Sequence, residues 1–217
     1  MNASPSSAAV PADASARRQP AGRHRWRVVD IVVASVIGVA SGVVFLAWNV
    51  AYQGPSELLS ALLPGLQGLL DGGWLFAGVL GALVIRKPGA ALYTEVIAAA
   101  VSALTGLGNT WGAFLTLEAG IVQGLGAELV FLLFGYRRWS LPVAMLAGAG
   151  AAIFGGVNNL LLWYQGADTL FTVAYLISTT VSGVVIAGLL AWLLVRALAP
   201  TGALDAFPAG RAARERV

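Results

Sequence analysis

Residues 28–50 read VVDIVVASVIGVASGVVFLAWNV, an apolar run in which Asp30 is the sole ionisable side chain. At 1.5 Å per residue, a helix of this length crosses the roughly 30 Å of hydrocarbon in a bilayer. The run is also longer than the roughly 7–15 apolar residues at the centre of a signal peptide. A basic segment that includes Arg25 and Arg27 precedes it directly. The stretch therefore predicts a first membrane helix that the mature protein keeps.

The composition of the whole chain fits lipid better than water. Apolar residues make up 58% of the 217 residues, charged residues make up 11%, and the mean hydropathy is +0.80. A soluble domain carries about 25% charged residues, so this chain has too few charges to cover a surface that faces water. The chain has no Cys, which excludes disulfides and thiolate metal sites.

Five more apolar segments follow the first. They are expected at 66–86, 89–106, 112–135, 141–163 and 169–198. Each approaches or exceeds the roughly 20 residues that a crossing needs. Pro64 and Asp71-Gly72-Gly73 interrupt the region of the second crossing. We therefore expect a second helix that is broken or preceded by an interfacial segment, with a pair of re-entrant half-helices as the alternative.

The positions of the basic residues decide between these alternatives. The 13 Lys and Arg residues lie in four short stretches: the segment up to Arg27, Arg86-Lys87, Arg137-Arg138, and Arg196 onward. The intervening connections carry no basic residue: 51–65, 107–111 and 164–168. Six crossings place every basic residue on one side, which the positive-inside rule makes cytoplasmic. We predict an all-α plasma-membrane bundle of six transmembrane helices with both termini in the cytoplasm, and no nucleic-acid site.

The two ends of the chain are expected to lie outside the bundle. Residues 1–27 are rich in Ala, Ser, Pro and Arg and predict a disordered, basic cytoplasmic tail. Residues 28–198 predict one transmembrane substrate-binding domain, and residues 199–217 predict a second disordered cytoplasmic tail.

Missing residues exclude several classes of enzyme. The sole His is His24 in the N-terminal tail, and the sole Lys is Lys87 at a predicted cytoplasmic turn. A His-based metal site, a Ser-His-Asp triad and a Ser-Lys dyad are therefore not available within the membrane. The chain also has no Gly-x-x-x-x-Gly-Lys-Ser/Thr loop for ATP. We expect no enzyme activity, no cofactor and no metal, so energy for uphill transport must come from an ion gradient or a partner subunit.

Ionisable side chains inside the apolar segments are the most informative feature for function. An Asp, Lys or Arg at mid-bilayer costs roughly 2.5–3.5 kcal/mol even on a lenient scale. Glu95, Glu118 and Glu128 lie in such segments, and no basic residue is expected at the same depth. Unpaired carboxyl groups in hydrocarbon need hydrogen bonds, water or a ligand. For Glu95 an ion pair with Arg86 and Lys87 is expected, whereas Glu128 is either a structural hydrogen-bond hub or ligand-facing.

Amides and aromatic rings join these acids in the outer half of the predicted bundle. Glu118 is expected to face a ligand because it lies at that depth without a visible partner. The other expected substrate-binding residues are amides and aromatic residues: Gln123, Asn159, Trp163, Tyr164, Asn109, Trp111 and Asn49. Such a lining suits a small, flat, hydrogen-bonding molecule stacked between rings. Trp and Tyr at helix ends are also typical of interfacial belts, and buried amides of helix–helix hydrogen bonds.

Small residues form a row on the first helix. Ala34, Gly38 and Gly42 are spaced four apart and so share one face. Another helix can approach such a face closely. We predict that this row docks onto another membrane subunit, with packing inside the bundle as the alternative.

Five short motifs resemble a known family of transport proteins. They are Arg86-Lys87-Pro88-Gly89-Ala90-Ala91, Tyr93-Thr94-Glu95, Gly106-Leu107-Gly108-Asn109 with Trp111-Gly112, Glu118-x4-Gln123-Gly124-x-Gly126-Ala127-Glu128, and Tyr136-Arg137-Arg138-Trp139. Together with the hydropathy pattern over 28–198, they resemble the substrate-binding (S) components of energy-coupling-factor (ECF) transporters. The likeness is greatest to the YkoE-type family, which is associated with thiamin or its hydroxymethylpyrimidine precursor.

The resemblance implies a six-helix membrane protein that binds a vitamin or its precursor and docks on a coupling transmembrane subunit with two cytoplasmic ATPases. It implies that Ala34, Gly38 and Gly42 belong to the docking surface, and it supports Glu118 and Gln123 as ligand-binding residues. The alternative function is a structural or regulatory membrane subunit without a small-molecule ligand. A gradient-driven carrier is less favoured, because it would need its own alternating gate in very few helices.

Overall fold

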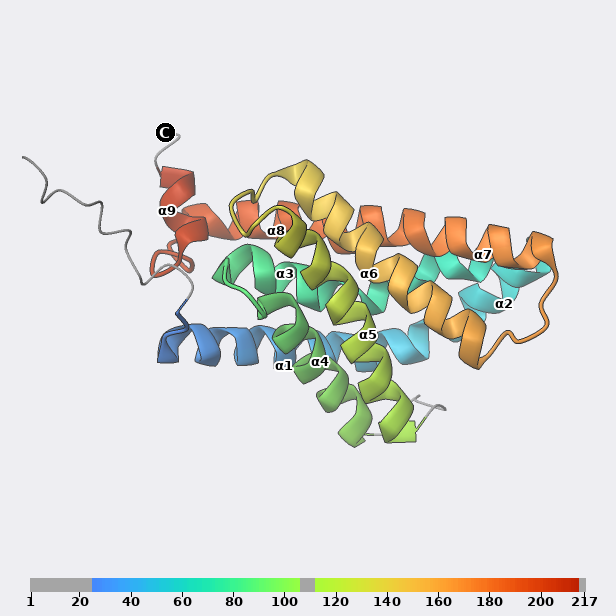
Figure 1. Ribbon diagram of the computed structural model, residues 1–217. Coiled ribbons are helices and arrows are strands. Elements are labelled where there is room, and N and C mark those ends of the chain that lie inside the picture. Colours follow the sequence, from blue (N-terminus) through green and yellow to red (C-terminus); the bar gives the residue numbers. More distant parts are fainter. Residues whose placement is uncertain (1–24, 106–111, 215–217) are drawn as a thin grey trace, which may run out of the picture.

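The computed structural model describes residues 25–105 and 112–214, and every regular element in these ranges is a helix (Figure 1). The elements are α1 (Val28–Ala51), α2 (Gln53–Leu62), η1 (Leu66–Trp74), α3 (Phe76–Ile85), α4 (Ala90–Thr105), α5 (Gly112–Leu133), α6 (Leu141–Leu162), α7 (Thr169–Ser182), η2 (Gly183–Leu190), α8 (Ala191–Leu198), η3 (Ala199–Thr201) and α9 (Pro208–Arg214).

Membrane-length helices dominate the fold. Within the described residues, five helical stretches are long and apolar enough to cross a membrane: Val28–Ala51, Leu66–Ile85, Gly112–Leu133, Leu141–Leu162 and Thr169–Thr201. The remaining predicted crossing corresponds to α4, which is shorter at 16 residues. The all-α membrane fold is therefore confirmed, while the count of six crossings and the direction of the chain stay predictions.

The second crossing is broken where Pro and Gly interrupt the sequence. After α2, Gly65 adopts a left-handed backbone with φ of +100°, and the chain continues through the 3-10 helix η1 into α3. η1 lies very close to its neighbours, because a Cβ added to Gly73 would stand 2.1 Å from Nε1 of Trp48. Gly72 N–H donates to Ser182 Oγ at 2.9 Å, which ties η1 to the end of α7. This close packing holds Asp71 inside the bundle.

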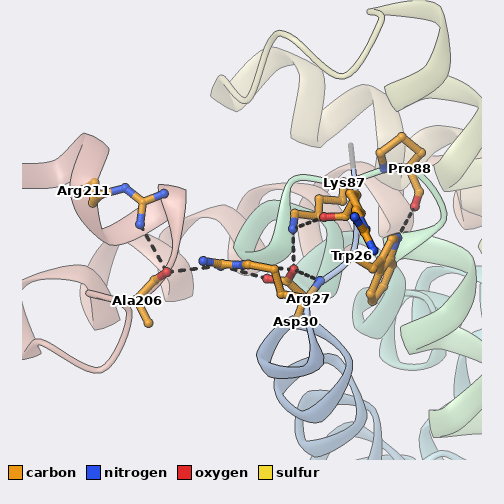
Figure 2. Close-up of polar contacts among 8 residues, drawn as sticks. Trp26, Arg27, Asp30, Lys87, Pro88, Ala206 and Arg211 are labelled. Atoms are coloured by element: carbon orange, nitrogen blue, oxygen red, sulfur yellow. Dashed lines mark hydrogen bonds and ion pairs between the residues drawn. The ribbon is translucent and has the colours of Figure 1, made fainter. Parts of the chain in front are cut away.

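The first and last described segments, residues 25–30 and 199–214, lie at one end of the bundle, here called the basic end, where Arg27, Arg86, Lys87 and Arg211 are found (Figures 1 and 2). The carboxylate of Asp30, which is 0% exposed, pairs there with Lys87 and with Arg27. Lys87 Nζ also donates to the Arg25 carbonyl oxygen at 2.6 Å. These contacts fix the start of α1 on the α3–α4 connection. Ordered contacts thus begin at residue 25, and the predicted disorder of residues 1–24 lies outside the described residues.

The C-terminal segment differs from the sequence prediction. Residues 199–214 do not form a featureless tail, because they fold into η3, a turn and α9. Leu204 and Phe207 are buried and join the core that α3 helps to form. Arg27 Nη2 donates to the Ala206 carbonyl oxygen at 3.4 Å (Figure 2). The prediction of disorder overlooked Leu204 and Phe207, two apolar side chains three residues apart that pack on the core. Residues 215–217 lie outside the described residues.

The small-residue row of α1 faces inward, so its prediction as a partner-docking surface is wrong. Ala34 is 0% exposed, and Gly38 and Gly42 are also buried. A Cβ at Gly38 would stand 2.7 Å from Ile97 of α4, and one at Gly42 would stand 2.6 Å from Val101. The row therefore allows α1 and α4 to pack closely within the chain, which is the alternative left open by the sequence.

Gly38→Leu is expected to lower the midpoint of thermal unfolding in detergent by roughly 5 °C, because an overpacked helix contact costs about 1–3 kcal/mol. Ala40→Leu is the matched control, since Ala40 is exposed on the same helix. The control should unfold within about 1 °C of the unmodified protein. Equal midpoints for all three proteins would show that the α1–α4 contact is looser than described.

Lys87→Met is expected to destabilise the protein by roughly 3 kcal/mol, because it leaves the buried Asp30 carboxylate with Arg27 as its one remaining charged partner. Equilibrium denaturation in micelles measures this change. The double variant Lys87→Met/Asp30→Asn should recover part of the loss, since no buried charge is then left over. Arg138→Met, at an exposed residue, is the control and should be neutral. A neutral Lys87→Met would contradict the role of the pair.

Candidate functional site

The helices enclose a cavity of about 580 Å³ at the end of the bundle opposite to the basic end. Its walls come from the C-terminal ends of α1 and α6, from η1, from the N-terminal part of α5, and from residues 95–102 of α4 and 175–179 of α7. The volume lies within the roughly 300–1,000 Å³ of small-molecule sites. Aromatic, amide and carboxyl side chains all contribute to the lining.

Glu95 of α4 supplies the first carboxyl group of the cavity wall. It is 1% exposed, and its Oε2 accepts a hydrogen bond from the Gly78 N–H at 2.5 Å. Its Oε1 is buried without a hydrogen-bond partner among the described residues. The expected ion pair with Arg86 and Lys87 is therefore wrong. Lys87 pairs with Asp30, and Arg86 donates to backbone carbonyl oxygens at 3.2 and 3.4 Å.

Asp71 of η1 supplies the second carboxyl group. It is 8% exposed, and its Oδ2 accepts from Tyr175 Oη at 2.7 Å and from Thr179 Oγ1 at 3.0 Å. Asn159 Nδ2 donates to Tyr175 Oη at 2.8 Å, so a chain of hydrogen bonds joins α6, α7 and η1. Asn159 Oδ1 is buried without a hydrogen-bond partner among the described residues. Asp71 was not among the site residues predicted from the sequence, because Asp71-Gly72-Gly73 was interpreted as an interruption of the second crossing.

Aromatic rings form two groups in the walls. On the α1 and η1 side, the rings of Tyr52 and Trp74 lie 4.8 Å apart. On the α6 and α7 side, Tyr164 lies 5.1 Å from Tyr175. Burial raises the pKa of Tyr52 and of Tyr164, and the negative charge of Asp71 raises both further. Both phenols therefore keep their protons at neutral pH and can donate hydrogen bonds.

Five of the predicted site residues line the cavity: Gln123, Asn159, Trp163, Tyr164 and Asn49. Asn49 Oδ1 accepts from Trp74 Nε1 at 2.8 Å, which fixes both side chains against the cavity. The predicted residues Asn109 and Trp111 lie outside the described residues.

Glu118 is absent from the cavity lining. Its Oε2 accepts from Asn158 Nδ2 at 3.0 Å, so it joins α5 to α6. The reason is the phase of α5. Thr116, Gly120 and Gln123 are spaced three to four apart and face the cavity, whereas Glu118 falls between them on the flank toward α6. The expectation that Glu118 faces a ligand was based on its depth in the membrane, and depth does not determine the direction in which a side chain points.

Glu128 is a structural hub. Its two carboxylate oxygens accept from the N–H groups of Gly89 at 2.6 Å, Ala91 at 2.9 Å and Leu92 at 3.3 Å, at the N-terminus of α4. Tyr136 Oη donates to the same carboxylate at 2.7 Å. A carboxylate is stabilised at a helix N-terminus by the free N–H groups and by the helix dipole. Of the two readings left open, the structure thus favours the structural one.

The charged side chains that line the cavity are acidic. Asp71 and Glu95 both belong to its lining, whereas no Lys or Arg does among the residues that the structure describes. The ion pairs found in those residues join Arg27 and Lys87 to Asp30 at the basic end. The two unpaired atoms, Glu95 Oε1 and Asn159 Oδ1, are both hydrogen-bond acceptors. This arrangement can bind a molecule that brings N–H donors, a positive charge, or both.

Comparisons with known proteins identify the family of this chain. The chain is 36% identical over 192 residues to a protein described as an HMP/thiamine permease, YkoE of Bacillus subtilis (strain 168), covering 88% of this chain and 94% of that protein. The chain belongs to the YkoE family of ECF-transporter S components. A solved crystal structure of an S component of an ECF transporter matches with a TM-score of 0.80 and 34% identity, covering 88% of this chain and 95% of that one.

A family profile also matches this S component. The profile, described as the permease component of an ABC-type cobalt transport system, covers residues 29–154. Within the described residues, however, no group of three or more His, Cys, Asp or Glu side chains is placed to hold a metal ion. The match therefore supports the class of transporter, and the chemistry of the cavity has to indicate the cargo.

Sequence reasoning missed the two carboxyl groups of this S component that line the cavity, although signals for both were present. Asp71 is the one ionisable residue in the span 66–85. Glu95 shares a helix face with Ala99 and Ser102, which leaves space beside its carboxyl group. A carboxyl group beside small residues inside an apolar helix is the pattern that would have selected Glu95.

Proposed function

We propose that this S component binds thiamin or its hydroxymethylpyrimidine precursor in the cavity, and delivers it inward through a coupling permease driven by partner ATPases. The observation that carries the proposal is the pair of buried, unpaired acceptors, Glu95 Oε1 and Asn159 Oδ1, in a cavity with two carboxyl groups. Buried polar atoms are rarely left without a partner, so these two call for a ligand that donates hydrogen bonds.

An aminopyrimidine has the matching chemistry. Its exocyclic amino group donates two hydrogen bonds and can serve the free oxygen of Glu95. Its flat ring can stack on the aromatic walls, which include Trp74 and Tyr164. The description of the relative YkoE as an HMP/thiamine permease supports this class of ligand.

The Asp71 side of the cavity suits a cationic ring. The carboxyl group of Asp71 accepts a hydrogen bond from the phenol of Tyr175, and the rings of Tyr52 and Tyr164 belong to the same cavity lining. A thiazolium ring carries a permanent positive charge, which carboxylates and aromatic faces both attract. Asn49, Gln123 and Trp163 belong to the proposed binding site as further lining residues.

The direction of transport follows from the charges. The basic end gathers the start of α1, the α3–α4 connection and α9 (Figure 1), and Arg86 lies 5.9 Å from the ring of Trp139 in the α5–α6 connection. The positive-inside rule places this end in the cytoplasm, so both termini are cytoplasmic and the cavity opens toward the outside. The sequence has no ATP-binding loop, and in this proposal partner ATPases and a coupling subunit supply the energy.

The alternative function, a structural subunit without a small-molecule ligand, is less well supported. Such a subunit would use its buried polar groups to join helices, as Glu118 does with Asn158 and Glu128 does at α4. Glu95 and Asn159 instead keep an unpaired acceptor beside a cavity of about 580 Å³.

Glu95→Gln is expected to weaken the binding of thiamin and of hydroxymethylpyrimidine by roughly 10–100-fold, because a hydrogen bond to a charged group contributes about 1.5–3 kcal/mol. Isothermal titration calorimetry on the purified protein measures this. Glu118→Gln is the matched control, because it removes a carboxyl group outside the cavity. Its affinity for both compounds should stay within about threefold of that of the unmodified protein.

The opposite pattern, with loss of binding in Glu118→Gln and none in Glu95→Gln, would indicate that the ligand contacts Glu118, as expected from the sequence, and not Glu95. If the unmodified protein bound neither compound, the proposed ligand class itself would be wrong.

A further inference from the structure

The cavity offers little to a negatively charged ligand. A phosphate group in a protein is usually held by Lys or Arg, or by free N–H groups at a helix N-terminus. No Lys or Arg lines the cavity in the described part of the chain. The 13 basic residues lie in four stretches of the sequence, and none of these stretches contributes a residue to the described lining.

At α3 and α7, an N–H group near the helix N-terminus is already bonded to a carboxyl group of the chain itself. α3 begins next to Leu75, which lines the cavity, and its Gly78 N–H donates to Glu95. α7 begins at Thr169, and its Phe171 N–H donates to Asp168 Oδ1 at 2.7 Å. These two N–H groups are therefore not free to hold a phosphate.

Two hydroxyl donors of the lining are engaged in the same way. Tyr175 Oη and Thr179 Oγ1 both donate to Asp71 Oδ2, so their protons already serve a carboxyl group. The buried atoms without a partner among the described residues, Glu95 Oε1 and Asn159 Oδ1, are acceptors. A phosphate ester entering here would meet two carboxyl groups and no basic side chain in the described lining, and the neutral phenols of Tyr52 and Tyr164 could offset its charge only in part.

We propose that Asp71 and Glu95 make the cavity a charge filter, which admits neutral and cationic forms of the ligand and rejects their phosphate esters. This inference rests on the proposed function, because it concerns the same cavity and the same class of ligand. Its consequence is an order of reactions. A ligand that is present outside as a phosphate monoester must first be hydrolysed by a phosphatase, which uses water to give the free alcohol and inorganic phosphate.

The test compares each free compound with its ester in the unmodified protein. The probes are thiamin with thiamin monophosphate and hydroxymethylpyrimidine with its phosphate, with dissociation constants measured by calorimetry at fixed salt. We expect esters to bind about 100-fold or more weakly than the free compounds, because repulsion from each nearby carboxylate should weaken binding of an anionic ester by roughly tenfold. Free compounds that bind while their esters bind within about threefold would overturn the charge filter and leave the proposed function standing. Failure of the free compounds to bind would contradict the proposed function instead.

Variants then test the residues. Asp71→Asn should weaken binding of the free compound. It should also reduce the ratio of the ester's dissociation constant to that of the free compound by roughly tenfold, since it removes one negative charge. Gln123→Lys places a positive charge in the wall and should narrow the ratio similarly, and it serves as the second variant should Asp71→Asn fail to fold. Glu57→Gln is the control, because it removes an exposed carboxylate outside the cavity and should keep the ratio of the unmodified protein. A ratio that stays unchanged in the variants of Asp71 and Gln123 would overturn the assignment.

Discussion

Carboxyl groups inside this helical bundle depend on donors that the protein supplies, because hydrocarbon supplies none. Asp30 forms ion pairs with Lys87 and Arg27, and Glu128 accepts hydrogen bonds from three backbone N–H groups and a phenol. Each arrangement joins segments that are far apart in the sequence. The need to satisfy these groups therefore fixes the basic end and the start of α4, and so determines much of how the helices stand against one another.

The cavity is the place where this requirement is only partly met. Asp71 has two hydroxyl donors and Glu95 has one backbone donor, yet one oxygen of Glu95 and one of Asn159 remain unpaired among the described residues. An unsatisfied buried acceptor is costly, and a ligand that donates hydrogen bonds would offset this cost. Under the proposed function, affinity for a donor-rich or cationic molecule and poor affinity for an anion are two results of one arrangement.

Small residues allow these polar groups to reach one another. Gly73 lets η1 approach Trp48, and Gly38 and Gly42 let α1 lie directly on α4. Helices that pack this closely bring short side chains such as Asp71 within hydrogen-bond distance of a neighbouring helix. These three glycines are therefore part of how the site is built, and they face other helices of the same chain.

The sequence by itself determined the all-α membrane fold, the limits of the helices and the break in the second crossing, because hydropathy, length and Pro-Gly interruptions act locally along the chain. It also gave five cavity residues, since the depth of Asn49, Gln123, Asn159, Trp163 and Tyr164 can be counted along each helix. The tertiary structure decided which carboxyl groups face the cavity, because that depends on how each helix is rotated against its neighbours. A difference of one or two positions on α5 turns Glu118 toward Asn158, while the rotation of α4 and the break at η1 bring Glu95 and Asp71 to the cavity walls. The same dependence on neighbours folded Leu204 and Phe207 onto the core in a segment that local composition marked as disordered.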